Sequence, residues 1–269
     1  MDYKNLAVRT VSGAVIVTLI VAATLMSGWY FAALFGLIAM LATHEFMTIN
    51  GMAEWKAWTA AAASLAMFLL PFVEHDILIA TIWTLIIFGM IAVELWLKAS
   101  DPIRNWSIFA LSQIYIALPF TLMHILQIES DIFDGTSWVF VLFVIIWVND
   151  SFAFLTGSFL GRHRMFERIS PKKSWEGFVG GNLFALVAAF AFWMLYPRMC
   201  GFCEWLLIVE VIVVFGTLGD LVESLMKRTL GLKDSGRIIP GHGGMLDRFD
   251  SAILAAPMLY IITLIINYL

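Results

Sequence analysis

The feature that most constrains this chain is a series of nine apolar runs, each close to the length of a membrane-crossing helix. The runs cover residues 8–26, 29–47, 57–73, 77–97, 106–128, 137–160, 175–196, 204–226 and 249–268. A helix needs about 20 mainly apolar residues to cross the hydrocarbon layer. Charged residues are 13% of the 269, against about 25% in soluble domains. The sequence therefore predicts an all-α, polytopic integral membrane protein with about nine transmembrane helices.

The first run poses a choice between a cleaved leader and a retained helix. Lys4 and Arg9 flank its start, and the small residues Ala22 and Ala23 lie near its end, as in secretory signal peptides. The second run begins almost at once, so a retained hairpin of two helices is the preferred interpretation.

Lysine and arginine are distributed unevenly among the connectors, which predicts the orientation of the helices. With the N-terminus inside, the inner segments hold Lys4, Arg9, Lys56, Lys98, Arg104, Arg162, Arg164, Arg168, Lys172, Lys173, Lys227, Arg228, Lys233, Arg237 and Arg248, which leaves Arg198 outside. The outer connectors instead hold Glu74, Asp76, Glu129, Asp131 and Asp134. By the positive-inside rule, the loops 161–174 and 227–248 face the cytoplasm, and we expect a bacterial inner-membrane protein.

Residues 224–250 combine charge, glycine and histidine more densely than the rest of the chain. The loop supplies the cations Lys227, Arg228, Lys233, Arg237 and Arg248, and it surrounds His242 with Gly241, Gly243 and Gly244. Glycines let backbone amides approach an oxyanion. Asp247 and Asp250 have the i, i+3 spacing of one helix face, and their hard oxygens suit Mg²⁺ better than zinc. A basic loop with two helix-capping aspartates is the alternative for any single residue, but the whole set indicates phosphate and metal chemistry.

This stretch resembles the signature of the phosphatidate cytidylyltransferases, also called CDP-diacylglycerol synthases. The signature positions are Ser224, Lys227, Arg228, Lys233, Asp234, Gly236, Pro240, His242, Gly243, Gly244, Asp247, Arg248 and Asp250, in that order and spacing. The resemblance covers residues 149–250, whereas the first five runs match only in being hydrophobic.

Asp220 lies inside a predicted span and is a second candidate site residue. A charge at that depth is costly unless it is paired, protonated or bound to a cation. Asp220, Ser224 and Lys227 share one helical face, and Glu223 pairs naturally with Lys227. Gly216 and Gly219 predict close helix packing nearby. A structural salt bridge between helices is the alternative.

Asn149 and Asp150 interrupt another apolar run, and the stretch 170–177 follows it. This stretch resembles a second block of the same family. Ser170 is expected to cap a helix with Pro171 at its first position, which leaves Lys172 and Lys173 near an anion-attracting N-terminus. Ordinary flanking charge is the alternative; beside the resemblance, triphosphate binding is preferred.

The resemblance implies transfer of a cytidylyl group from CTP to phosphatidic acid, giving CDP-diacylglycerol and pyrophosphate. It implies catalytic roles for Asp220, Asp247, Lys227, Arg228 and His242, of which His242 orients a phosphate or an aspartate rather than acting as a nucleophile. Substrate phosphates are assigned to Lys172, Lys173, Ser224, Lys233, Gly243, Gly244 and Arg248. One or two Mg²⁺ sites are assigned to Asp220, Asp247, Asp250, Asp150 and Asn149. The expected partners are CTP, phosphatidic acid and the bilayer, with no nucleic acid.

Two regions are predicted: an N-terminal transmembrane scaffold over 1–135, and a catalytic transmembrane region over 136–269. The scaffold holds about five spans; a homodimer surface is left open for it, and His44 and Glu45 are expected at the membrane interface. Cys200 and Cys203 lack the context of a redox or metal motif.

Three other functions remain open. A transporter would also bury acidic residues, but it should show internal repeats, and none is found. A structural membrane protein needs no acidic residues in its spans. An enzyme that uses CTP on another lipid phosphate fits the same residues, whereas the motif of CDP-alcohol phosphotransferases is absent.

Overall fold

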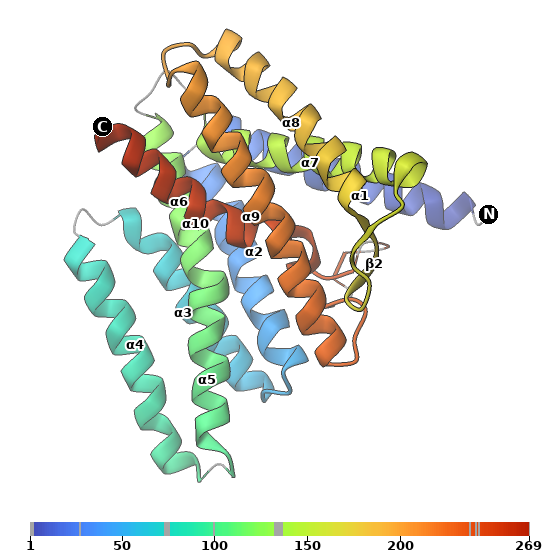
Figure 1. Cartoon of the computed structure of the whole chain (residues 1–269). Coiled ribbons are helices and arrows are strands. Elements are labelled where there is room, and N and C mark those ends of the chain that lie inside the picture. The colour runs from blue at the N-terminus through green and yellow to red at the C-terminus, as the bar shows by residue number, and fades with distance from the viewer. Residues whose placement is uncertain are drawn as a thin grey trace. The chain divides into compact units, whose positions relative to one another are not determined.

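The computed structural model describes the chain apart from residues 1, 2, 27, 73–75, 99, 132–136, 237, 240, 242 and 269. Its described residues are helical almost throughout (Figure 1). They form two compact units, each made of two separate stretches of the chain. Unit 1 contains residues 1–125 and 234–248, and unit 2 contains residues 126–233 and 249–269. Residues 234–248, which we call the signature loop, therefore belong to the same unit as the N-terminal helices, whereas the other signature positions belong to unit 2. The division into scaffold and catalytic regions at 135 stays a prediction.

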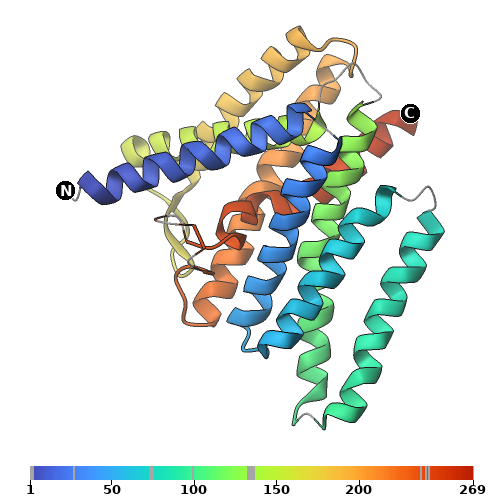
Figure 2. The ribbon, with the colours of Figure 1, turned by 180° about the vertical axis from the view of Figure 1, so that it is seen from behind.

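Unit 1 is a bundle of helices. Its elements are α1 (Tyr3–Met26), α2 (Gly28–Ile49), α3 (Glu54–Leu69), the 3₁₀ turn η1 (Leu70–Phe72), α4 (Asp76–Leu97), α5 (Pro102–Ser112), the π-helical turn η2 (Gln113–Ala117) and the first part of α6 (Leu118–Asp131). Helices α3, α4 and α5 lie side by side, as the view from behind in Figure 2 also shows. Small residues such as Ala57 and Ala60 on α3 let α2 and α3 pack closely, and large buried side chains such as Phe31, Phe35 and Phe46 on α2 fill the rest of the core.

Two pairs of side chains connect helices of unit 1. The Phe68 and His124 rings stack with centroids 4.6 Å apart, and His124 Nδ1 lies 2.7 Å from the Phe68 carbonyl oxygen. Lys56 on α3 and Glu94 on α4 form a buried ion pair, with Nζ 2.5 Å from Oε1. Lys56 is thus a helix residue inside unit 1 and does not behave as the connector charge that the sequence predicted.

Unit 2 contains the remainder of α6, α7 (Trp138–Leu160), the strands β1 (Arg164–Phe166) and β2 (Ser170–Ser174), α8 (Trp175–Leu195), α9 (Phe202–Thr229) and most of α10 (Leu246–Tyr268). Helices α7 and α8 approach closely because glycines line the contact. A Cβ atom at Gly177 would lie 2.8 Å from the Ala153 carbonyl oxygen, and one at Gly181 would lie 2.6 Å from Asn149 Oδ1. The predicted close packing at Gly219 is confirmed, since a Cβ atom there would collide with the Asp250 carbonyl oxygen.

Among the residues that the structure describes, six helices are long and apolar enough to cross a membrane. They are Gly28–Ile49, Pro102–Ser130, Trp138–Leu160, Trp175–Leu195, Phe202–Thr229 and Leu246–Asn267. The first and fourth predicted runs lie in α1 and α4, whose fully described parts include the apolar helical stretches Thr10–Met26 and Thr81–Leu97. The third run corresponds to α3, whose 16 residues reach about 24 Å, less than the hydrocarbon thickness of about 30 Å. The all-α membrane fold is confirmed, and the count of nine crossings is not.

The prediction that Ser170 caps a helix is wrong. Residues 170–174 form β2, which pairs antiparallel with β1, and α8 begins only at Trp175. Ser174 is the cap, and its Oγ accepts a hydrogen bond from the Gly177 amide at 3.1 Å. Glu176 adds to this by accepting hydrogen bonds from the amides of Arg162 and His163, both at 3.1 Å. These contacts hold the chain as a hairpin up to Ser174, so Lys172 and Lys173 lie on a strand.

Candidate active site

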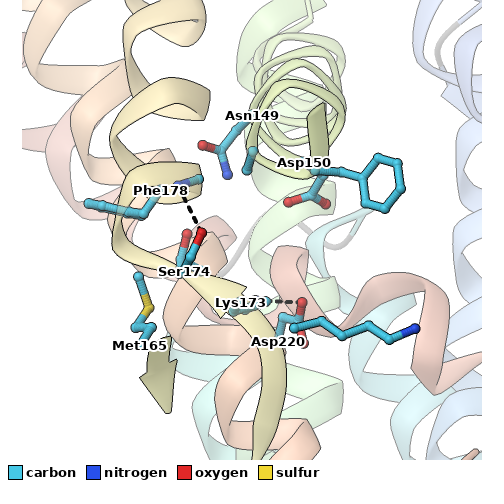
Figure 3. Close-up of a pocket in the computed structure, with 12 residues that line it drawn as sticks. Asn149, Asp150, Met165, Lys173, Ser174, Phe178 and Asp220 are labelled. Atoms are coloured by element: carbon cyan, nitrogen blue, oxygen red, sulfur yellow. Dashed lines mark hydrogen bonds and ion pairs between the residues drawn. The ribbon is translucent and has the colours of Figure 1, made fainter. Parts of the chain in front are cut away.

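A pocket of about 310 Å³ in unit 2 gathers several of the predicted site residues. Helix α7 contributes Asn149 and Asp150, strand β2 contributes Lys172 and Lys173, and helix α9 contributes Asp220. Apolar side chains, among them Phe154, Met165 and Phe178, form the rest of its wall. Figure 3 shows Asp150 and Asp220 facing the same space, with Lys173 directed toward Asp220. The pocket therefore combines acidic and basic groups from three separate elements.

Asp220 is held from two sides. Its Oδ2 lies 2.6 Å from Lys173 Nζ, and its Oδ1 accepts a hydrogen bond from Ser224 Oγ at 3.2 Å, one helical turn further along α9. The side chains of Asp220 and Lys173 are 29% and 27% exposed, so both are still open to solvent or a ligand. The Asp220–Ser224 part of the predicted shared face is thus confirmed, and the carboxylate keeps a fixed orientation.

Asp150 and Asn149 form the α7 side of the pocket. Asp150 is exposed, and the charges of Lys173, Asp220 and Asp250 all act on it. Asn149 is buried, and within the described part of the chain its Oδ1 accepts no hydrogen bond. A buried amide oxygen without a donor and a carboxylate beside other carboxylates both favour a cation as a neighbour.

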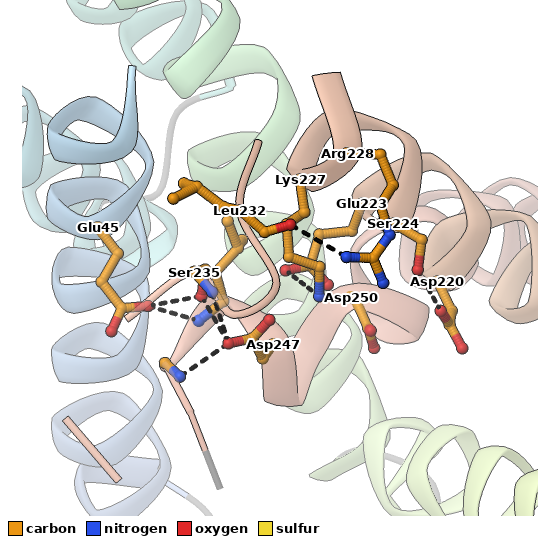
Figure 4. Close-up of polar contacts among 12 residues, drawn as sticks. Glu45, Asp220, Glu223, Ser224, Lys227, Arg228, Leu232, Ser235, Asp247 and Asp250 are labelled. Carbon is orange, nitrogen blue, oxygen red and sulfur yellow. Dashed lines mark hydrogen bonds and ion pairs between the residues drawn. The ribbon is translucent and has the colours of Figure 1, made fainter. Parts of the chain in front are cut away.

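Asp250 lies behind this pocket in a second group of charges. Its carboxylate is near those of Asp220 and Glu223 and feels the charge of Lys227. Glu223 is fully buried and pairs with Lys227, whose Nζ is 3.3 Å from Glu223 Oε1 (Figure 4). The predicted pairing of Glu223 with Lys227 is confirmed, and it supplies one positive charge to a cluster that is otherwise acidic.

Arg228 connects the end of α9 to the hairpin. Its Nε donates to the Ile169 carbonyl at 3.5 Å, and its NH1 donates to the Leu232 carbonyl at 3.1 Å. Helix α9 stops here because Gly231, at φ +70°, reverses the chain and lets the Leu232 amide donate to the Lys227 carbonyl. Lys233 follows on the surface of the same unit.

The signature loop in unit 1 is built around Asp247. Its Oδ2 accepts three hydrogen bonds: from the Ser235 amide at 2.8 Å, from Ser235 Oγ at 3.0 Å and from the Gly244 amide at 2.8 Å (Figure 4). The Gly244 amide is therefore engaged inside the loop. Gly243, at φ +82°, takes a backbone conformation that other residues rarely adopt, and its carbonyl accepts from the Ile239 amide. Arg248 is exposed.

Glu45 is a member of this cluster that sequence reasoning missed. The residue is only 5% exposed, so it is buried inside unit 1, and its expected place at the membrane interface stays a prediction. Its Oε2 accepts hydrogen bonds from the Leu246 amide at 2.9 Å and from Ser235 Oγ at 3.3 Å. The one sequence signal was a carboxylate inside an apolar run. His44 turns elsewhere, with Nε2 3.1 Å from Glu54 Oε2.

Some predicted site residues fall outside this description. Arg237, Pro240 and His242 lie outside the described residues, so the role of His242 stays a prediction. Within the described ranges, no three acidic, histidine or cysteine side chains converge tightly enough to hold a metal ion by themselves. Oxygen donors of the type that Mg²⁺ prefers are nevertheless grouped in each unit.

Comparison with known proteins agrees with this chemistry. A model of the cytidylyltransferase family matches residues 7–266. A phosphatidate cytidylyltransferase of Bacillus subtilis (strain 168) is 40% identical over 178 residues, which are 64% of this chain and 65% of that protein. Proteins of the same name from Staphylococcus epidermidis and Staphylococcus aureus are 33% and 29% identical, and each alignment covers 95% of this chain and 98% of the relative. Because the family model spans nearly the whole chain, the protein belongs to the cytidylyltransferase family.

Proposed function

We propose that this membrane protein is a phosphatidate cytidylyltransferase, which transfers CMP from CTP to phosphatidic acid and releases pyrophosphate. Family membership and the relatives of that name support the reaction class. The observation that carries the proposal is the unit 2 pocket, where Lys172 and Lys173 stand beside Asp150 and Asp220. CTP and a lipid phosphate both carry negative charge, and fixed cations lower the repulsion between them.

The pocket residues fit Mg²⁺ by donor type. Asp220 and Asp150, with Asp250 behind them and the amide oxygen of Asn149, offer hard oxygen ligands. Mg²⁺ usually takes one or two carboxylates together with substrate phosphates and waters, so it does not require three protein ligands converging beforehand. When bound, the ion would neutralise charge on the triphosphate and on the leaving pyrophosphate. Asp247 is retained as a further proposed ligand, and a second cation is left open.

The cations of the site have separate proposed tasks. Lys173 neutralises Asp220 in the free protein and is placed to contact the triphosphate when CTP enters. Lys172 lines the same pocket. Lys227 pairs with Glu223, and Arg228 donates a hydrogen bond to the hairpin backbone. We therefore propose that both residues set the charge and shape of the pocket and act on the substrate phosphates indirectly. Ser224 keeps Asp220 oriented.

The proposed reaction is a direct displacement. A phosphate oxygen of the lipid forms a bond to the α-phosphorus of CTP, while the bond from that phosphorus to the bridging oxygen breaks and pyrophosphate leaves. A phosphate monoester has its second pKa near ~6, so at neutral pH the lipid phosphate is largely a dianion and needs little help from a base. No protein nucleophile is required.

This mechanism predicts that no nucleotidyl-enzyme forms. Protein incubated with CTP labelled at the α-phosphate, without lipid, should retain no covalent label after denaturation. Initial rates at varied CTP and phosphatidic acid should give intersecting double-reciprocal lines. Retained label, or parallel lines, would contradict direct displacement.

The activity itself is tested by pyrophosphate release. Purified protein is given CTP, Mg²⁺ and one lipid phosphate at a time, from a panel that includes phosphatidic acid, a lysophosphatidic acid and an isoprenyl phosphate. The proposal predicts the highest kcat/KM with phosphatidic acid. A clear preference for another lipid phosphate would favour the related enzyme that uses CTP on that substrate.

We also propose nine membrane crossings, with the N-terminus and the hairpin at 164–174 in the cytoplasm. The charge distribution supports this arrangement, and six of the helices have the necessary length and hydropathy. A bacterial inner membrane and a cytoplasmic active site belong to the same proposal. A homodimer stays a prediction.

A further inference from the structure

We propose that Glu45 is a positioning residue for this reaction: from helix α2, its buried carboxylate fixes the conformation of the signature loop. We call Glu45, Ser235 and Asp247 the loop clamp. The inference rests on the proposed function in assigning the loop to the reaction. The clamp itself lies within unit 1 and is defined by contacts there.

The loop clamp ties the two ends of the loop to each other and to α2. Asp247 Oδ2 holds the amides of Ser235 and Gly244, and Glu45 Oε2 holds the amide of Leu246. Ser235 Oγ lies between the two carboxylates, 3.3 Å from Glu45 Oε2 and 3.0 Å from Asp247 Oδ2. Its single proton can serve one acceptor at a time. The two acidic residues thus share five donor contacts.

Burial explains why these contacts matter. Glu45 is 5% and Asp247 8% exposed, and a buried carboxylate is costly unless donors surround it. The loop amides, in turn, need acceptors once they leave water. The loop amides supply the donors that the carboxylates need, and the carboxylates supply the acceptors that the amides need. The loop is therefore stable mainly in the conformation that brings Ser235 and Leu246 to the carboxylates. Without Glu45, the Leu246 amide loses its acceptor.

The glycines of the loop support the same role, because two of them make room for the Glu45 carboxylate. A Cβ atom at Gly236 would collide with Glu45 Oε1, and one at Gly244 would lie 2.5 Å from Glu45 Oε2. The φ angle of Gly236 lies outside the left-handed region, so its backbone does not itself demand glycine. The reason for glycine there is the space that Glu45 occupies.

The test compares Glu45→Ala, Glu45→Gln, Gly236→Ala and the double variant Gly236→Ala/Glu45→Ala, in the full-length protein in detergent or lipid nanodiscs. Glu54→Gln is the matched control, because Glu54 is an exposed carboxylate of unit 1 that pairs with His44. Two readouts are taken: hydrogen exchange of the peptide containing residues 234–248 without substrates, and kcat and KM for CTP and phosphatidic acid.

We expect Glu45→Ala to raise exchange in the 234–248 peptide and nowhere else, and to lower kcat between about tenfold and about a hundredfold, as small misplacements of reacting groups do. Glu45→Gln keeps an acceptor oxygen and should restore most of both readouts. Gly236→Ala should resemble Glu45→Ala, and the double variant should be no worse than either, since all three break the same contacts. Glu54→Gln should behave as the parent protein.

Unchanged exchange at 234–248 in Glu45→Ala would overturn the inference. So would raised exchange throughout unit 1, because that would make Glu45 a general packing residue, or a failure of Glu45→Gln to restore kcat. If the parent protein transfers no cytidylyl group, the proposed function fails, and the exchange data still decide whether the clamp exists.

Discussion

Lys173 is the site residue whose observed surroundings differ most from those that the sequence predicts. The sequence places it at a helix N-terminus, where it would add to an existing positive field. The structure places it on β2 with Nζ 2.6 Å from Asp220 Oδ2, where it compensates a carboxylate. The ion pair compensates the charge of Asp220, and the partly exposed lysine is still open to an incoming phosphate.

We predict that Lys173→Gln lowers kcat/KM for CTP by about tenfold to about a hundredfold, mainly through KM, because a charge that contacts the ground-state triphosphate is lost. The measurement is steady-state kinetics at saturating phosphatidic acid. Lys98→Gln removes an exposed lysine outside the pocket and is the control. An unchanged KM for CTP would show that Lys173 does not bind the triphosphate.

Cys200 and Cys203 should differ sharply in reactivity. Burial, and then the nearby Glu204 carboxylate, raise the pKa of the Cys200 thiol to about 12. At pH 7 only roughly one thiol in 10⁵ would be the reactive thiolate. We expect a maleimide to modify the exposed Cys203 and to leave Cys200 unmodified, with the rate at Cys200 rising as the pH approaches 12. Mass spectrometry of the Cys203→Ser variant checks this, and rapid labelling of that variant at pH 7 would refute it.

The elements owe their arrangement to glycine contacts between helices. Gly219 on α9 packs against the α10 backbone at Asp250, and Gly177 and Gly181 on α8 pack against α7 at Ala153 and Asn149. These contacts set the positions of the carboxylates on α7, α9 and α10, because each acidic residue is next to or within a turn of a close approach. The pocket geometry therefore depends on residues that carry no functional group.

We predict that Gly219→Ala destabilises the protein by about 1–3 kcal/mol, the usual cost of forcing an atom into a packed core, and lowers activity together with stability. Gly89→Ala on α4 is the control, since a Cβ atom there would have no neighbour within 4 Å. Thermal unfolding and pyrophosphate release are measured on both. Equal stability of the two variants would mean that the α9–α10 contact accommodates the added methyl group without loss of stability.

The sequence predicted the features that depend on residues close together in the chain. It did not predict the contacts between residues that are far apart in the chain. The nine apolar runs are helical over nearly all of their described residues, and the pairs Asp220–Ser224 and Glu223–Lys227 follow from helical spacing. The hairpin at 164–174 was missed because Ser170–Pro171 fits a helix start. Pairing with β1 and the Glu176 contacts decide its structure. Glu45 was missed because its partners lie 190 and 201 residues away in the chain.

Both polar loops, 161–174 and 227–248, are expected to face the cytoplasm. In a Cys200→Ser/Cys203→Ser background, cysteines are introduced one at a time at Arg164, Ile238 and Arg198. All three positions are exposed, so each thiol should be reachable. A membrane-impermeant maleimide applied to intact cells should label the cysteine at 198 and spare those at 164 and 238. Labelling at 164 or 238 from outside would contradict this predicted topology.

The central claim is that cytidylyl transfer to phosphatidic acid takes place at the Asp220 pocket with a divalent cation. Its most direct test is transfer of label from the α-phosphate of CTP into lipid, in vesicles containing phosphatidic acid and purified protein. The parent protein should transfer label with Mg²⁺ and lose activity with a chelator. Asp220→Asn should lose at least about a hundredfold while keeping the unfolding temperature of the parent. Lipid labelling by folded Asp220→Asn above about a tenth of the parent rate, or none by the parent protein, would contradict the account.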